Sequence, residues 1–239
     1  MISETLSQAQ DFLKWVEDAA SEVGLYMNEK KTEYMCFNQR GNNLTSVSNK
    51  ELKSVDDFVY LGSWINTTER DLSIKIAKAW GASKKLDKIW KSDLNRNLKV
   101  KFFRATVESV LLYGAECWTL TKNLEKKLDG TYTRLLRASL NINWRQRVTN
   151  KSLYGNLAKV SQLVRERRLR FAGHCYRAKD ECISDLLLWR PKHGRRSVGR
   201  PAKTYVDLLG EDSNFKTEEI VEDRVLWIGV VRHRTKLQT

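Results

Sequence analysis

The chain has 239 residues, of which 41% are hydrophobic and 30% charged, with 43 Lys and Arg against 29 Asp and Glu. Twelve Gly and two Pro are too few for a collagen-like or low-complexity chain, and they disfavour an all-β fold. No apolar run reaches the length of about 18 residues that a membrane span needs, and the N-terminus lacks the pattern of a signal peptide. Four cysteines without close pairing fit reduced thiols, so we expect an intracellular protein, nuclear or cytoplasmic.

The positive charge is concentrated in the middle of the chain. Residues 1–60 hold 6 basic and 10 acidic side chains, whereas residues 61–164 hold 20 and 8, and residues 165–203 hold 12 and 4. Residues 204–239 are slightly acidic, with 5 and 7. This local surplus of basic side chains indicates a polyanionic partner, most simply nucleic acid. The alternative is a set of solvated helix faces.

The first 67 residues predict a small mixed domain. Residues 4–23 carry Leu6, Leu13 and Val16 on one stripe at helical spacing, and Gly24 suits a C-terminal cap. Short aromatic or apolar stretches predict strands over 31–37, 52–55 and 58–65.

Beyond Thr68 the apolar spacing is helical. Helices are expected over 71–92, 97–113, 124–140, 149–157, 160–176, 203–210 and 217–232. Residues 190–201 hold both prolines and five basic residues and predict a linker. The predicted fold is α+β and mainly α, with a small domain over 1–67, a helical region over 68–158 and a basic helical region over 159–239.

Four tryptophans lie in apolar helical contexts, where tryptophan is far more often a core residue than a platform for stacking bases. We therefore predict core positions for Trp80, Trp90, Trp118 and Trp144.

Several short motifs follow one another along the chain: GLYMNEKKTE at Gly24–Glu33, YLGS at Tyr60–Ser63, LLYGAECW at Leu111–Trp118, LLR at Leu135–Arg137, RRLRFAGH at Arg167–His174 and GRP at Gly199–Pro201. Together and in this order they resemble the motifs that follow the catalytic core of non-LTR retrotransposon reverse transcriptases. The resemblance implies the end of a palm, a primer-grip-like hairpin, a helical thumb and a basic C-terminal tail.

In that family the catalytic aromatic-x-Asp-Asp motif precedes a helix like 4–23. The resemblance therefore implies a downstream piece whose partners include the missing palm and fingers. The intact enzyme would use Mg2+, but this chain alone is expected to hold no cofactor and to be inactive as an RNA-directed DNA polymerase. Asp56-Asp57 superficially resembles a catalytic pair but follows the first motif, and we interpret it as a turn before a strand.

Two features of the N-terminal domain take roles from the resemblance. Lys31 would lie near the phosphates of an incoming nucleotide, and the alternative is a solvent-facing lysine at a strand start. A tight hairpin of Tyr60, Leu61, Gly62 and Ser63 would press its backbone against the primer terminus, where Gly62 permits close approach.

Three groups of basic residues are expected to contact an RNA–DNA or DNA duplex, through phosphates rather than bases. The first group forms a stripe along one helix. The second group crowds one helix, where a polyanion would relieve the repulsion between like charges. The third group lies in the proline-containing segment, where Gly199-Arg200-Pro201 resembles an AT-hook core. They comprise, in order, Lys75, Lys78, Lys84, Lys85, Lys88 and Lys91; Arg165, Arg167, Arg168 and Arg170; and Arg195, Arg196, Arg200 and Lys203.

His174, Cys175, Cys182 and His193 are weak candidates for a zinc site. A structural zinc site usually has a close Cys pair, which is absent here, and adjacent His174 and Cys175 rarely bind one ion together. The alternative is a histidine at a helix C-terminus and two buried thiols.

The expected function is a fragment of a retrotransposon RNA-directed DNA polymerase that grips primer–template nucleic acid. The alternative is a stand-alone basic module, derived from such an element, that binds nucleic acid or an acidic protein. Duplex binding that weakens steeply with salt would separate the phosphate binders from the protein binder.

Overall fold

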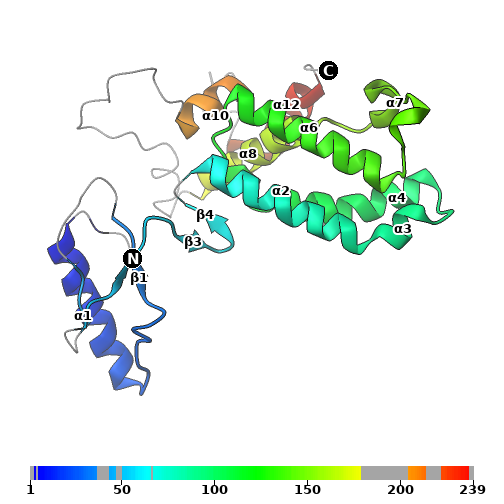
Figure 1. The fold of residues 1–239 in the computed structure, drawn as a ribbon. Helices are drawn as coiled ribbons and strands as arrows, with labels where there is room; N and C mark the ends of the chain where they lie inside the picture. Colours follow the sequence, from blue (N-terminus) through cyan, green and yellow to red (C-terminus); the bar gives the residue numbers. More distant parts are fainter. Residues whose placement is uncertain are drawn as a thin grey trace. The chain divides into compact units, whose positions relative to one another are not determined.

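The computed structural model describes residues 3, 5–36, 43–46, 50–65, 67–178, 204–213 and 222–236 (Figure 1). The chain divides into two compact units, residues 1–67 (unit 1) and residues 68–239 (unit 2). Helices dominate, and every strand of the described residues lies in unit 1, which confirms the α+β, mainly α fold. No helix in the described ranges combines the length and apolarity needed to cross a lipid bilayer. The linker predicted at 190–201 lies outside the described residues.

Unit 1 begins with helix α1 (Leu6–Glu22). The Thr5 hydroxyl accepts a hydrogen bond from the Gln8 amide, and the Gln8 side chain accepts one from the Thr5 amide, which forms a capping box. Gly24, at φ 75°, follows the helix end as predicted. Leu13 of α1 packs with Leu44 and Leu52 in a small apolar cluster.

The strands of unit 1 are short. Strand β1 (Glu33–Tyr34) pairs in parallel with β2 (Lys53–Ser54), and β3 (Val59–Tyr60) pairs antiparallel with β4 (Ser63–Trp64). The single strand expected over 58–65 is therefore wrong, whereas the tight hairpin that the resemblance implies at Tyr60–Ser63 is present. Leu61 and Gly62 have φ values of 48° and 81°, as in a two-residue type I′ turn.

Two neighbouring helices, α2 (Thr68–Lys85) and α6 (Lys122–Ser139), lie side by side in unit 2 (Figure 1). The helix expected over 71–92 breaks at Leu86, and α3 (Asp87–Lys91) follows. The break brings Trp90 back onto α2, where its indole donates a 2.8 Å hydrogen bond to the Ser83 carbonyl.

The next helical run contains a wider turn. Helix α4 (Arg96–Phe103) continues through the π-helical turn η1 (Arg104–Glu108) into α5 (Ser109–Leu111). Gly114, at φ 74°, then turns the chain into the 3-10 helix η2 (Ala115–Cys117). Beyond α6, the 3-10 helix η3 (Trp144–Gln146) and helix α7 (Asn150–Tyr154) lead to α8 (Val160–Arg177).

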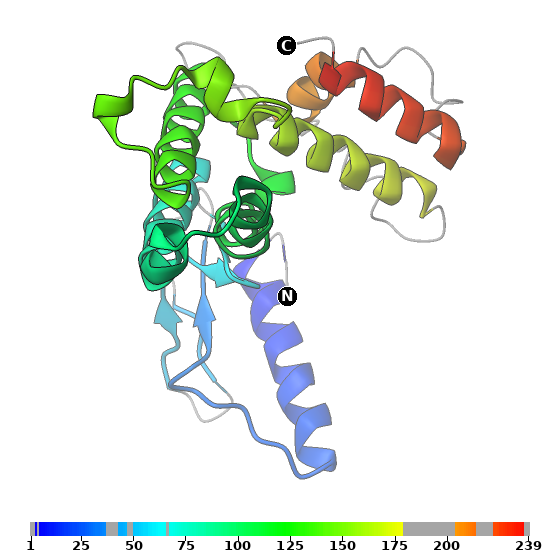
Figure 2. The ribbon, with the colours of Figure 1, turned by 90° about the vertical axis from the view of Figure 1, so that its right-hand side faces the viewer.

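Two apolar clusters in the described residues of unit 2 share α8. The larger lies between residues 72 and 164 and includes Leu72, Phe103, Val107, Leu128, Leu135 and Val164, all at most 1% exposed. The smaller joins Leu169 and Ala172 of α8 to Leu209 of α10 (Tyr205–Ser213) and to Trp227 and Val231 of α12 (Arg224–Lys236). Figure 2 shows α12 lying along α8.

The tryptophan prediction holds for half of its members. Trp90 and Trp118 are each 3% exposed, as expected of core residues. Trp144 is 80% exposed, so the prediction is wrong there: it lies on η3 in a connecting segment, where the guanidinium of Arg145 covers its ring at 5.5 Å. Trp80 is 38% exposed at the edge of α2 and is also no core residue.

Candidate nucleic-acid interface

The predicted site residues of unit 1 lie on two separate features. Tyr60, Leu61, Gly62 and Ser63 form the tip of the β3–β4 hairpin, with Tyr60 and Leu61 exposed. Lys31 is an exposed residue of the turn before β1, and its backbone amide donates a 2.9 Å hydrogen bond to the Asn28 carbonyl. Asp56 and Asp57 form a bend before β3.

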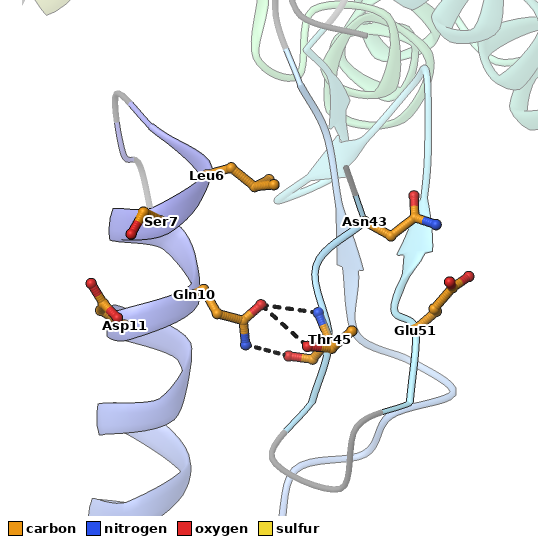
Figure 3. A pocket seen from close by; sticks show the side chains of 7 residues that line it. All are labelled: Leu6, Ser7, Gln10, Asp11, Asn43, Thr45 and Glu51. Carbon is orange, nitrogen blue, oxygen red and sulfur yellow. Dashed lines mark hydrogen bonds between the residues drawn. The ribbon is translucent and has the colours of Figure 1, made fainter. Parts of the chain in front are cut away.

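Unit 1 also contains an open pocket between α1 and the residues Asn43, Thr45 and Glu51 (Figure 3). The Gln10 amide spans it: its Nε2 donates to the Thr45 carbonyl at 2.6 Å, and its Oε1 accepts from the Thr45 amide at 3.0 Å. Among the described residues, the lining includes the carboxylates Asp11 and Glu51 and no basic side chain. The pocket is therefore electrostatically unsuited to a phosphate.

The predicted lysine stripe is divided between two helices. Lys84 and Lys85 end α2, and Lys88 and Lys91 lie on α3; all four are exposed, with Lys91 paired to Asp87 at 2.6 Å.

Lys75 does not belong to this stripe, which corrects the prediction. It is 3% exposed, and its Nζ lies 4.5 Å from the centroid of the Tyr113 ring. Burial lowers the pKa of the Lys75 ammonium.

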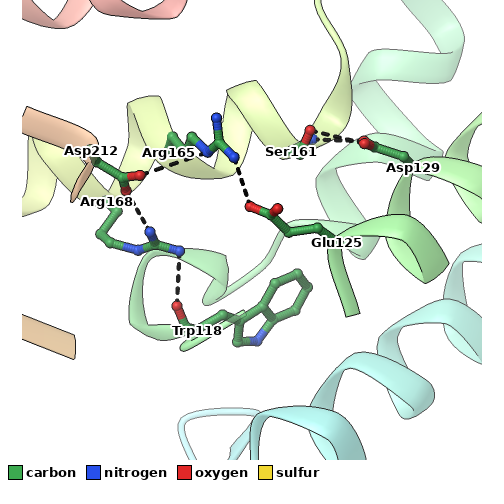
Figure 4. Close-up of polar contacts among 7 residues, drawn as sticks. All are labelled: Trp118, Glu125, Asp129, Ser161, Arg165, Arg168 and Asp212. Atoms are coloured by element: carbon green, nitrogen blue, oxygen red, sulfur yellow. Dashed lines mark hydrogen bonds and ion pairs between the residues drawn. The ribbon is translucent and has the colours of Figure 1, made fainter. Parts of the chain in front are cut away.

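The arginines of α8 form contacts inside the protein (Figure 4). Arg168 is 2% exposed and donates to the Asp212 carboxylate at 2.5 Å and to the Trp118 carbonyl at 3.0 Å. Arg165 donates to Glu125 at 2.9 Å, and its Nε lies 3.7 Å from Asp212. The prediction that Arg168 contacts nucleic acid is therefore wrong, because its guanidinium is enclosed by protein.

The remaining arginines of α8 differ in exposure. Arg167 donates to the Leu112 carbonyl at 2.8 Å, and Arg170, whose side chain is 56% exposed, pairs with Glu166 at 2.5 Å. Carboxylates thus neutralise most of this cluster, so its internal repulsion needs no polyanion. Of the four, Arg170 is the one best placed to reach a phosphate.

Burial raises the pKa of the Asp212 carboxyl, while the guanidinium groups of Arg168 and Arg165 oppose that effect. The network joins α8 to α10 through Asp212, to α6 through Glu125 and to the segment after η2 through Trp118. A further link is the Asp129 carboxylate of α6, which accepts from the Ser161 amide and hydroxyl at 3.0 Å each (Figure 4). These contacts hold the helices together and do not by themselves indicate a catalytic site.

Two of the sequence motifs meet in this network. Arg167 and Arg168, which begin the motif at Arg167–His174, bond to the carbonyls of Leu112 and Trp118 in the motif at Leu111–Trp118. The Trp118 indole in turn donates a 2.7 Å hydrogen bond to the buried Asp71. Both motifs therefore specify how α8 packs, a role that spacing within either motif does not reveal.

The zinc candidates do not form a site in the part of the chain that the structure describes. His174 is exposed on α8, whereas Cys175 is buried, and burial raises the pKa of its thiol. No group of three His, Cys, Asp or Glu residues there is arranged to hold a metal ion. Cys182 and His193 lie outside the described residues, as do the predicted contacts Arg195, Arg196, Arg200 and Lys203.

Further exposed basic residues were absent from the sequence prediction. Lys126, Lys127 and Arg134 are exposed residues of α6, which contacts α2, the helix that carries the predicted Lys78. Lys127 Nζ donates to the Ser73 hydroxyl of α2 at 3.1 Å. The signal that could have found them is the spacing of three or four residues along one helix face, the same signal that marked the α2 stripe.

Over 260 aligned residues the chain is 27% identical to an uncharacterised transposon-derived protein of Caenorhabditis elegans. The alignment covers 98% of this chain and 92% of the relative. The similarity supports a transposon origin. No protein-family model matches the chain, and no solved structure matches it.

Proposed function

We propose that the chain is a nucleic-acid-binding part of a retrotransposon reverse transcriptase, and that unit 2 holds a primer–template duplex. The observation that carries this proposal is the charge of unit 2: residues 68–239 hold 37 basic and 19 acidic side chains, against 6 and 10 in unit 1. A surplus of this size attracts a polyanion and speeds its association.

The similarity to a transposon-derived protein and the order of the motifs support the proposal that the chain comes from a retrotransposon.

The hydrogen bonds of the buried carboxylates favour a binding role over a catalytic one. Asp71 accepts from Trp118, Glu108 from Tyr132, and Asp212 from Arg168, so these buried or half-buried acids are engaged in the fold. Polymerisation would need two carboxylates that face solvent and hold two divalent metal ions.

The proposed protein partner is the palm and fingers region that precedes such a segment in an intact enzyme. Support comes from the side of α1 that faces away from Leu13. Phe12 and Trp15 on that side are 47% and 64% exposed, and their ring centroids are 5.5 Å apart.

The test is binding of the purified chain to a fluorescently labelled RNA–DNA hybrid, measured by anisotropy over a range of salt concentrations. We expect log K to fall linearly with log salt concentration, by about 0.9 per neutralised phosphate if the hybrid behaves as B-DNA does. Absence of binding at low salt, or affinity that does not change with salt, would contradict the proposal. An acidic protein partner would then become the better explanation of the charge.

A further inference from the structure

Two glycines occupy exposed positions inside the long helices of unit 2. A Cβ atom added to Gly81 of α2 or to Gly130 of α6 would meet nothing within 4 Å. At Gly173 of α8, by contrast, a Cβ would lie 2.1 Å from Nε1 of Trp227, so packing requires glycine there. Glycine inside a helix destabilises it relative to alanine. Neither packing nor helix stability therefore accounts for Gly81 and Gly130.

The two glycines face the same side of unit 2. Helices α2 and α6 run in the same direction: Thr68 bonds to Thr119 near their starts, and Lys127 bonds to Ser73 one to two turns later. The Ser73–Lys127 bond marks the line along which the two helices touch. At about 100° per residue, Gly81 is rotated about the axis of α2 by about 80° from Ser73, and Gly130 is rotated about the axis of α6 by about 60° from Lys127 in the opposite sense. Because the helices run in the same direction, opposite rotations away from their line of contact bring both glycines to the same solvent-exposed side.

Basic side chains surround both glycines. Lys78, Lys84 and Lys85 lie three or four residues from Gly81, and Lys126, Lys127 and Arg134 stand in the same relation to Gly130; all six are exposed. Residues 77–85 contain no carboxylate, and the one in residues 126–134, Asp129, is bonded to Ser161 of α8. We call this surface the α2–α6 face.

The α2–α6 face differs from the cluster on α8 in both charge and access. On α8, Arg165, Arg168 and Arg170 are paired with Glu125, Asp212 and Glu166, respectively, and Arg168 is enclosed. On the α2–α6 face the cations are exposed, and each glycine lets another chain come as close as the helix backbone permits.

We propose that the α2–α6 face is the surface on which the phosphate backbone of a nucleic-acid duplex lies, with Gly81 and Gly130 at the points of closest approach. This inference rests on the proposed function and assigns it to a particular surface. Lysines on either side of a glycine reach phosphates without reading bases, so the contact is independent of sequence. Side chains at positions 81 and 130 would hold the duplex away from those lysines.

The first experiment enlarges the glycines in the full chain. Gly81→Leu and Gly130→Leu, singly and together, are expected to weaken binding of the labelled RNA–DNA hybrid several-fold while the melting temperature stays equal or rises. The matched control is Gly210→Leu on α10, where a Cβ also meets nothing within 4 Å but Asp207 and Glu211 are close in sequence. Its affinity should equal that of the parent chain. Gly81→Ala and Gly130→Ala test the same contact with a smaller side chain, and we expect them to weaken binding less than the leucine variants do.

The second experiment changes charge. Lys84→Gln, Lys85→Gln and Lys126→Gln should each reduce the salt slope by about 0.9 if each contacts one phosphate. Unchanged affinity in well-folded Gly→Leu variants, or a larger loss of slope from Arg170→Gln than from these lysine variants, would overturn the assignment while leaving the proposed function standing. Failure of the parent chain to bind the hybrid would instead remove the proposed function itself.

Discussion

Two nearby arginines on helix α8 differ sharply in solvent exposure. Arg168 is 2% exposed and bonded to Asp212 and the Trp118 carbonyl, whereas Arg170 is half exposed and paired with Glu166 one turn earlier. Removing one partner of a buried ion pair leaves the other charge without compensation, and this is strongly destabilising. An exposed pair contributes little, because water and salt screen it. Residue type alone therefore does not decide whether an α8 arginine is structural or free to bind.

Replacing Arg168 by methionine is expected to lower the free energy of unfolding at pH 7 by about 3–5 kcal/mol. Burial already raises the pKa of Asp212, and loss of Arg168 raises it further. An acid with a raised pKa in the folded state contributes stability below its unfolded pKa, and that contribution is lost as the pH rises through the folded value. The loss caused by Arg168→Met should therefore be larger at pH 7 than at pH 4, as measured by urea denaturation.

The matched control is Arg170→Met on the same helix. Its partner Glu166 lies one turn away and is partly exposed, so we expect a change of about 0.5 kcal/mol or less. Equal losses for the two variants would show that Arg168 is not a buried structural partner.

Helix α8 holds unit 2 together at the scale of elements. Its first half packs Val160 and Val164 into the larger cluster, and its second half packs Leu169 and Ala172 against α10 and α12. Gly173 allows the Trp227 ring to lie directly on the α8 backbone, where its indole donates a 2.9 Å hydrogen bond to the Leu169 carbonyl. The packing of α12 against α8 thus depends on the absence of a Cβ atom at Gly173.

Gly173→Ala is expected to lower the free energy of unfolding by about 1–3 kcal/mol, because the new methyl group meets the Trp227 ring. Thermal denaturation followed by circular dichroism measures the effect. Gly229→Ala on α12 is the control: its Cβ meets nothing within 4 Å, so that variant should gain up to about 1 kcal/mol through helix propensity. A gain at Gly173 as well would contradict the described packing of α12.

The sequence predicts helix positions well where the ends are marked locally. Thr5 and Thr149 cap their helices through hydroxyls that bond to nearby backbone amides, and Gly24 ends the first helix. Such signals lie within a few residues of the feature they control. Strands and breaks were less predictable, because Leu61 carries a positive φ that its type disfavours and Leu86 has no helix-breaking character.

The candidate interface was less predictable than the fold for the same reason. Arg168 is buried by Trp118 and Asp212, which are 50 and 44 residues away along the chain. The exposure of Lys126 and Arg134 depends on which side of α6 the rest of unit 2 leaves uncovered. Local spacing finds basic helix faces, but only tertiary packing separates the free cations from the engaged ones.

At the scale of the whole molecule, core and charge divide along the same boundary. Unit 1 has its own cluster around Leu13, and both larger clusters lie within unit 2. The basic surplus also lies in unit 2. Folding and duplex binding should therefore both reside in residues 68–239.

A chain of residues 68–239 alone is expected to unfold in one cooperative transition and to bind the RNA–DNA hybrid with the affinity of the full chain. Circular dichroism melts and anisotropy titrations at one salt concentration measure these two properties. Cooperative unfolding with lost affinity would mean that unit 1, including the hairpin tip at Leu61 and Gly62, supplies part of the binding surface.

The long reach of the α8 arginines also bears on how the protein is made. The carbonyls of Leu112 and Trp118 receive their donors from residues 55 and 50 positions later. At about 5–20 residues per second, a ribosome needs about 3–10 s to add that length of chain. Neither hydrogen bond can form before α8 has been synthesised, so we expect the packing of the Leu111–Trp118 segment to be completed late in translation.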